Sequence, residues 1–248
     1  MFPLIRDWTA VDRSTATNIR LGVTLSFVAG ATNAGGFLAV GQYTSHMTGI
    51  VSSIADHLVL GNLVLAGAAL GALLAFVCGA ASTACIVNWS LHRQLRSAYS
   101  LPLLLEALSL LVFGLAGAVI GSFSAVMVPL TVLLLCFIMG LQNAVITKIS
   151  RAEIRTTHVT GLVTDLGIEL GKLLYVNRHA TLQPVQANRS RLRIHALLVT
   201  GFFSGGVAGA IGFKMLGYIT TVPLAVLLLV LTTRPLLQDL RTLARHPH

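Results

Sequence analysis

The chain has 248 residues, of which 55% are hydrophobic and only 10% charged, and its formal net charge is +9. A soluble domain carries about 25% charged residues, so this chain has too few polar side chains to cover a water-soluble globule of its length. The composition predicts one all-α integral membrane domain over residues 1–248, with the lipid bilayer as its first partner. The three cysteines lie in apolar runs without metal-ligand spacing, so no metal site is predicted.

Six stretches are long and apolar enough to cross a bilayer as helices, which requires roughly 20 residues. Helices satisfy their own backbone groups in lipid, and these runs show no alternating barrel pattern. In chain order the predicted spans are Leu21–Val40, Leu63–Val87, Leu101–Gly121, Ala125–Ile146, Ala196–Leu216 and Ile219–Leu231. The last span is short before Arg234-Pro235, so its start is expected to reach back toward Leu216.

The basic residues predict the orientation of these spans. With the N-terminus in the cytoplasm, all but one of the 17 lysines and arginines lie in cytoplasmic segments, namely 1–20, 88–100, 147–195 and 232–248, as the positive-inside rule requires. Both termini are then cytoplasmic, the first span acts as an uncleaved signal anchor, and residues 178–195 form a basic cytoplasmic linker. Topology and anionic lipid account for the charge, so no nucleic-acid partner is predicted.

Two motifs occur twice, in the same order and at nearly the same spacing. Gly-x-x-Asn-Ala begins at Gly30 and at Gly140, and [Ser/Thr]-His-x-Thr-Gly follows around His46 and His158. The first repeat covers about 20–121 and the second about 126–232. Each repeat holds three spans, so the two enter the membrane from opposite sides. Such inverted repeats are typical of many secondary transporters.

These residues resemble the YoaK-type bacterial inner-membrane proteins, a family of unknown function. The resemblance rests on Gly30-Ala-Thr-Asn33-Ala with Thr44-Ser-His46-Met-Thr-Gly49, and on Gly140-Leu-Gln-Asn143-Ala with Thr157-His158-Val-Thr-Gly161. It extends from about Arg20 to Leu236 and implies a six-span protein of the bacterial inner (plasma) membrane. It supplies no substrate and no reaction.

The paired motifs are the candidate substrate site. Intramembrane amides either tie helices together or bind a ligand, and histidines either carry protons near neutral pH or have a structural role. Polar groups at matching positions of two repeats are poorly suited to face lipid. We therefore expect the motif side chains to converge on a small polar or anionic solute near the bundle centre. The six candidates are Asn33, His46, Thr48, Asn143, His158 and Thr160.

Each half also contains a short helical segment, within Gln42–Asn62 and Leu162–Val176. These segments are predicted to be re-entrant or interfacial, and Thr48 and Thr160 are expected to cap them. Gly35-Gly36 is expected to loosen the first span. Acidic residues in or near the bilayer are candidates for an ion or proton path. They are Glu106, placed close to the cytoplasmic end of its span, together with Asp56, Asp165 and Glu169.

No nucleotide-binding, cofactor or catalytic motif stands out. The favoured function is a small-solute secondary transporter or permease-like membrane protein, with proton coupling as an option. A membrane-embedded enzyme and a structural or assembly subunit of a membrane complex are the alternatives. A homo-oligomer is compatible with each of them.

Overall fold

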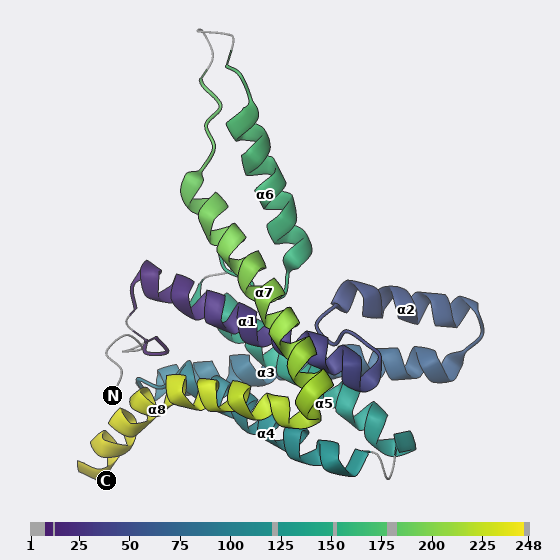
Figure 1. Cartoon of the computed structure of the whole chain (residues 1–248). Helices are drawn as coiled ribbons and strands as arrows, with labels where there is room; N and C mark the ends of the chain where they lie inside the picture. Colours follow the sequence, from purple (N-terminus) through teal and green to yellow (C-terminus); the bar gives the residue numbers. More distant parts are fainter. Residues whose placement is uncertain (1–7, 12, 121–123, 151–152, 178–182, 246–248) are drawn as a thin grey trace.

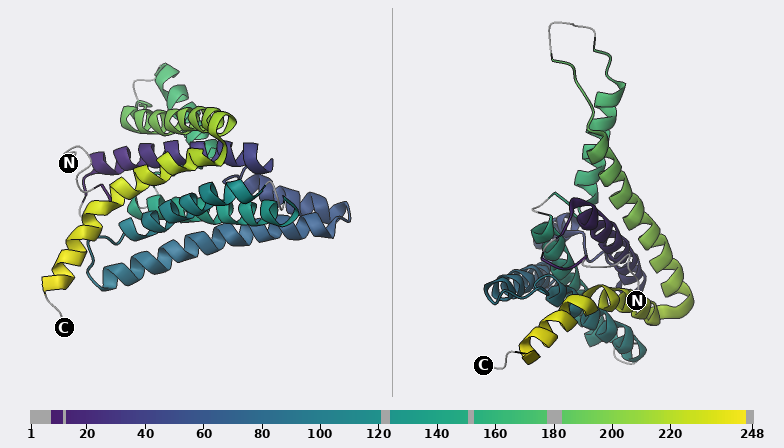
Figure 2. Two further views of the ribbon diagram at one scale, coloured as in Figure 1. Left: turned by 60° about the horizontal axis from the view of Figure 1, so that its bottom comes forward. Right: turned by 90° about the vertical axis from the view of Figure 1, so that its left-hand side faces the viewer.

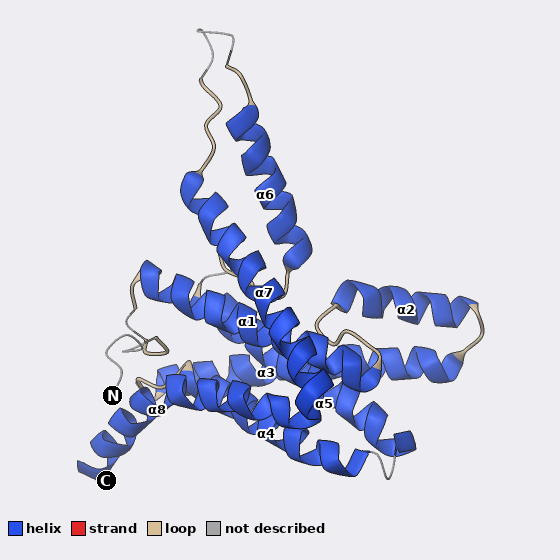
Figure 3. Cartoon of the chain, in the orientation of Figure 1, coloured by secondary structure: helices blue, strands red, loops and turns tan. Residues whose placement is uncertain are grey.

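The fold was analysed in a computed structural model that describes residues 8–11, 13–120, 124–150, 153–177 and 183–245. The described part is helical and contains no strand (Figure 3). Its elements are α1 (Thr15–Val40), α2 (Met47–Val59), α3 (Leu63–His92), α4 (Ser100–Ile120), α5 (Ser124–Ile149), α6 (Val159–Leu174), α7 (Arg189–Leu216), the 3-10 turn η2 (Gly217–Thr220) and α8 (Thr221–Arg245). The prediction of an all-helical chain is confirmed.

Within the described residues, four stretches are long and apolar enough to cross a membrane, judged by length and composition alone. They are Thr15–Val40, Leu63–His92, Val128–Ile149 and the continuous segment Arg189–Thr242, which contains α7, η2 and most of α8. Residues Ser100–Leu115 of α4 form a shorter apolar helix. Each predicted span therefore coincides with a long helix or with part of one.

The two ends of α1 are set by a capping serine and a glycine. Ser14 begins α1, and its side-chain oxygen accepts a hydrogen bond from the Thr17 backbone N–H. Gly41 ends α1 with φ 73°, a left-handed conformation that glycine adopts without steric cost.

Three predicted local features differ from the structure. The last helix is not short, since α8 continues through Pro235 to Arg245. The predicted linker 178–195 overlaps α7, which begins at Arg189 because the Asn188 side chain accepts from the Arg191 N–H. Residues 178–182 of that linker lie outside the described residues. Gly35 and Gly36 do not loosen α1, which continues unbroken to Val40.

The two halves of the chain are interlocked. The most extensive packing joins α1 to α7 and α3 to α5, so each contact pairs one helix from each half. α4 packs on α8, and α1 crosses α5 (Figure 1). The core between them is apolar and contains Leu25, Leu110, Met139 and Leu228, none of which is exposed. A core shared in this way makes the two halves one folding unit.

Four Phe-x-x-Gly segments allow the close helix crossings. A Cβ at Gly30 would lie 2.0 Å from the Phe202 carbonyl oxygen, and one at Gly205 would lie 2.0 Å from that of Phe27. The α3–α5 crossing has the same geometry. A Cβ at Gly79 would lie 2.1 Å from the Phe137 carbonyl oxygen, and one at Gly140 would lie 2.0 Å from that of Phe76. Backbones approach this closely only where a side chain is absent.

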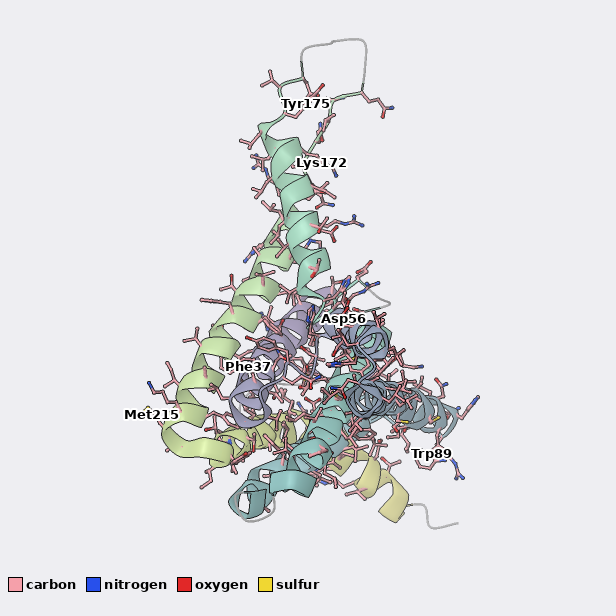
Figure 4. The ribbon with its side chains drawn as sticks, turned by 90° about the vertical axis from the view of Figure 1, so that its right-hand side faces the viewer. Phe37, Asp56, Trp89, Lys172, Tyr175 and Met215 are labelled. Atoms are coloured by element: carbon pink, nitrogen blue, oxygen red, sulfur yellow. The ribbon has the colours of Figure 1, made fainter. Side chains whose placement is uncertain are left out.

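Two hairpins extend from this core. α2 lies against the first part of α3, and α6 lies against the first part of α7. The outer part of the α6–α7 hairpin projects away from the other helices (Figure 1 and the right view of Figure 2). Lys172 and Tyr175 lie on its outer part, whereas Met215 lies at the far end of α7 (Figure 4). The short helix predicted for each half is confirmed as a helix.

Candidate functional site

In each half, the asparagine of the first motif holds the loop that carries the histidine. The Asn33 side-chain oxygen accepts hydrogen bonds from the Ser45 backbone N–H at 3.1 Å and from the Ser45 hydroxyl at 2.9 Å. The Asn143 side-chain oxygen accepts from the Thr157 hydroxyl at 2.6 Å, and its amide donates to the Met139 carbonyl at 2.8 Å. Both asparagines therefore act on the residue directly before the motif histidine.

The histidines begin the two short helices. His46 and His158 occupy the N-cap positions of α2 and α6, and neither helix has a side-chain cap. Each ring lies over the first helical turn, because a Cβ on Gly49 or Gly161 would be 2.5 Å from the Nδ1 of its histidine. The expected capping by Thr48 and Thr160 is wrong, since both threonines lie inside the first turn. No side-chain cap binds the first-turn N–H groups of either helix.

Two buried threonines lie in the same loops. Thr44 and Thr156, each two residues before its histidine, are 0% exposed, and their hydroxyls have no hydrogen-bond partner among the described residues. The residues directly before the two asparagines, Thr32 and Gln142, also have buried side-chain oxygens without a partner among the described residues. Native proteins rarely leave such groups unpaired. Matching positions in both halves thus offer buried polar atoms with unused hydrogen-bonding capacity.

Both histidine loops contact α1. The Ser26 hydroxyl of α1 lies 3.0 Å from both the Thr156 and the Leu198 carbonyl oxygens. In the first half, a Cβ at Gly36 would lie 3.8 Å from the Thr44 hydroxyl and 3.1 Å from Leu135 of α5. The buried threonines therefore lie close to the helices of the central core.

Two cavities open at these motifs. One, of about 610 Å³, is lined by His46 and His57 together with parts of α3 and α5. The other, of about 380 Å³, is lined by Asn33 and Tyr43 from the first half and by Val159 and part of α7 from the second. The second cavity brings the asparagine of one motif near the residue that follows the histidine of the other.

The six predicted site residues do not form a single hydrogen-bonded cluster. Asn33 is buried and Asn143 half-buried, but the motif histidines and threonines His46, His158, Thr48 and Thr160 are exposed. No hydrogen bond among the described residues joins the motif of one half to that of the other. His158 has Arg155 beside it, with 3.4 Å between Arg155 Nη1 and His158 Nδ1. The structure thus gives two similar local sites, each built from one motif.

The acidic candidates have different surroundings. Asp56 is exposed on α2, and the Asp165 carboxylate is 3.9 Å from the His195 ring. Glu169 is buried and accepts hydrogen bonds from Lys172 at 2.8 Å and from the Asn188 backbone N–H at 2.6 Å. The Lys172 hydrogen bond, followed by the one from Asn188, lowers the pKa of Glu169 below its usual range. Glu169 therefore fastens the α6–α7 hairpin as an ionised carboxylate.

Glu106 is 0% exposed and meets α5 through Gln142. Its Oε1 accepts a hydrogen bond from Gln142 Nε2 at 2.9 Å, while its Oε2 has no partner among the described residues. Sequence reasoning missed Gln142, Thr44 and Thr156. The hexapeptide Thr-[Ser/Thr]-His-x-Thr-Gly, complete in both halves, contained the signal for the two threonines.

The described residues contain no group of three or more His, Cys, Asp or Glu side chains placed to hold a metal ion. The molecule is thus an all-helical protein with long apolar helices and two copies of an asparagine-anchored histidine loop. The chain belongs to a family described as a protein of unknown function, DUF1275, which matches residues 21–233. This is the YoaK-type family indicated by the paired motifs. No curated protein and no solved structure matches the chain.

Proposed function

We propose that this protein is a secondary transporter or permease-like protein of the bacterial inner membrane that moves a small polar or anionic solute. In this proposal, α1, α3, α4, α5, α7 and α8 cross the bilayer, with both termini in the cytoplasm. α1–α4 and α5–α8 form two inverted repeats. The short helices α2 and α6 lie at or partly within the membrane, one near each face.

The repeated contacts support this arrangement. Both crossings between the halves use the same glycine-to-phenylalanine-carbonyl approach, at 2.0–2.1 Å from the glycine Cβ position. Both asparagines bind the hydroxyl residue before a histidine. A chain whose halves repeat their sequence, their crossings and their loops has the internal symmetry on which alternating access depends. The start of α1 and the end of α8 lie at the same end of the bundle (Figure 1).

The solute class follows from the groups that each loop leaves available. The N-terminal N–H groups of α2 and α6 lack a side-chain cap, and helix N-termini favour anions. The Arg155 guanidinium beside His158 adds positive charge at the second site. The buried Thr44 and Thr156 hydroxyls have no hydrogen-bond partner among the described residues, so a solute oxygen that reaches them would bind without breaking an internal bond. These two hydroxyls, at matching positions of the two halves, are the main support for the proposal.

The test uses purified protein in liposomes. Vesicles are loaded in turn with chloride, nitrate, formate, phosphate or sulfate. A potential-sensitive dye records electrogenic movement, and an internal pH dye records exchange with protons. We expect the wild-type protein to accelerate the flux of at least one of these anions above that of empty vesicles.

The matched variants are Thr44→Val with Thr156→Val, compared with Thr220→Val. Thr220 also has a buried, unpartnered hydroxyl, but it lies in η2, outside the motifs. Removing a buried unsatisfied hydroxyl leaves the fold as stable as before or more so. We expect at least a tenfold loss of flux in the motif variant, about 1.4 kcal/mol of binding or barrier energy, and none in Thr220→Val. Equal flux in both variants would refute the assigned site, and a wild-type protein that moves none of these anions would count against the transport proposal.

A further inference from the structure

Glu106 and Gln142 form a buried polar pair in an apolar core. Glu106 lies on α4 and Gln142 on α5, and both are 0% exposed. The neighbouring core residues Leu103, Leu110, Met139 and Val145 are likewise unexposed and apolar. One hydrogen bond, 2.9 Å long, joins Gln142 Nε2 to Glu106 Oε1. Two oxygens of the pair, Glu106 Oε2 and Gln142 Oε1, have no partner among the described residues.

Within the described residues, no charged side chain pairs with the Glu106 carboxylate. The elements packed on α4 are α3, α5, η2 and α8. Their described titratable side chains are Cys78, Cys85 and His92 on α3, Cys136 and Lys148 on α5, Tyr218 on η2, and Arg234, Asp239 and Arg241 on α8. None of them forms a hydrogen bond or an ion pair with Glu106 in the part of the chain that the structure describes. Lys148 is bound to Asn88, and Asp239 accepts from the Arg96 and Ser97 N–H groups.

Apart from the Gln142 amide, which donates to Glu106 Oε1, the pair offers no donor for its two unpartnered oxygens. An ionised carboxylate only accepts hydrogen bonds, and so does the amide oxygen of glutamine. Burying an uncompensated carboxylate costs far more than burying the neutral acid. A metal cation is a poor fit, because Ca²⁺ requires six to eight oxygen ligands and Mg²⁺ six, whereas the pair offers at most three. A single proton on Glu106 Oε2 removes the charge and turns an unpartnered acceptor into a donor.

We infer that Glu106, held by Gln142, is an internal proton-binding site and carries the proton that couples to solute movement. The coupling half of this inference rests on the proposed transport function, whereas proton binding does not. Gln142 is followed directly by Asn143, which holds the Thr157 loop at the start of α6. Consecutive residues of α5 thus connect the proton site to one of the two motif loops. Loss of the proton would leave an uncompensated charge at the α4–α5 contact and favour a state in which water reaches it.

Proton binding is tested with dicyclohexylcarbodiimide, a reagent that modifies protonated carboxyl groups in apolar surroundings. Purified wild-type protein in detergent is treated over a range of pH, and labelled peptides are identified by mass spectrometry. We expect modification at Glu106 that decreases as the pH is raised and is absent in Glu106→Gln. Infrared difference spectra of the same samples should show the carbonyl band of a protonated carboxylic acid, which the variant lacks.

The second buried glutamate is the matched control. Glu169 is 5% exposed but accepts hydrogen bonds from Lys172 and Asn188, so it is ionised and should remain unmodified. Glu106→Gln is expected to fold, because its amide can accept from Gln142 Nε2 and donate to Gln142 Oε1. Equal modification of both glutamates, or an unmodified Glu106 without the infrared band in folded wild-type protein, would overturn the proton site.

Coupling is tested separately in liposomes that carry a pH gradient. A proton gradient should accelerate uptake of the transported anion by the wild-type protein. Glu106→Gln should still exchange one anion for another, but its rate of gradient-driven uptake should be at least tenfold lower than that of the wild-type protein. Modification at Glu106 together with unchanged gradient-driven uptake in the variant would support proton binding and overturn its coupling role. If the wild-type protein shows no flux at all, the transport proposal is refuted. The proton site is then judged by the modification experiment alone.

Discussion

The α3–α5 crossing gives the sharpest stability prediction, because the close approach at Gly140 cannot accommodate a methyl group. An alanine Cβ at this position would lie 2.0 Å from the Phe76 carbonyl oxygen and 3.1 Å from the Ala80 backbone nitrogen. Both are backbone atoms and cannot rotate away. The two helices must separate by about 1 Å, since real contacts of this kind are not closer than about 3 Å.

The cost can be worked out from the contacts that this separation strains. Overpacking of a tight core costs about 1–3 kcal/mol. Separation also stretches the hydrogen bond from the Thr83 hydroxyl to the Leu141 carbonyl, now 3.0 Å long, which contributes about 0.5–1.5 kcal/mol. We therefore expect Gly140→Ala to destabilise the folded protein by about 2–4 kcal/mol.

Cys136 reports on this crossing directly. It lies on α5 beside Phe137 and is buried, whereas Cys78 and Cys85 are exposed. In a protein with Cys78→Ser and Cys85→Ser, the rate of thiol labelling at Cys136 in mild detergent measures how often α3 and α5 separate. We expect labelling in Gly140→Ala to be at least tenfold faster than in the parent protein.

The control is Gly67→Ala on α3, where a Cβ would meet nothing within 4 Å. This change should leave labelling unchanged or slow it, because alanine favours a helix over glycine by about 1 kcal/mol. Identical labelling of Gly140→Ala and Gly67→Ala would refute the close-crossing argument.

Three further predictions follow from the anchors and the ends of the helices. Asn143→Ala should destabilise the loop before α6 by about 1–3 kcal/mol, because the Thr157 hydroxyl loses its acceptor; faster hydrogen exchange in residues 153–158 would show this, and unchanged exchange would contradict it. Because the pKa of Glu169 is lowered in the folded protein, its contribution to stability is complete above the ordinary carboxyl pKa, about 4.3, and is lost as the pH falls through the lower folded value. Spin labels on the outer ends of α6 and α7 should therefore give a distance distribution that broadens once the pH falls below the ordinary carboxyl pKa, and one that is already broad at neutral pH in Glu169→Gln. A distribution that depends on neither change would disprove the clamp. In intact cells, single cysteines at Tyr43 and Asp56 should react with an impermeant reagent and one at Arg189 should not, and labelling at position 189 from outside would overturn the proposed topology.

The sequence by itself determined the helical class and the position of most helices. Runs such as Leu63–Val87 are long and almost entirely apolar, so composition and length are sufficient to predict that they form long apolar helices. The paired Asn and His motifs were also visible in the sequence, because repetition does not depend on three-dimensional context. Helix ends were less accurate, since the start of α7 at Arg189 depends on the Asn188 cap and on Glu169, nineteen residues earlier in the chain.

The tertiary structure decided which polar groups meet. No spacing rule pairs Glu106 with Gln142, because that contact depends on how α4 packs against α5. The same applies to the asparagines: the sequence placed Asn33 and Asn143 near a common centre, whereas each binds a hydroxyl residue in its own half. Burial also separated equivalent-looking residues, leaving Thr48 and Thr160 exposed and Thr44 and Thr156 buried without partners. The exposure and hydrogen bonding of these side chains arise from contacts between helices that are distant in the sequence, and the spacing of residues along the chain does not specify such contacts.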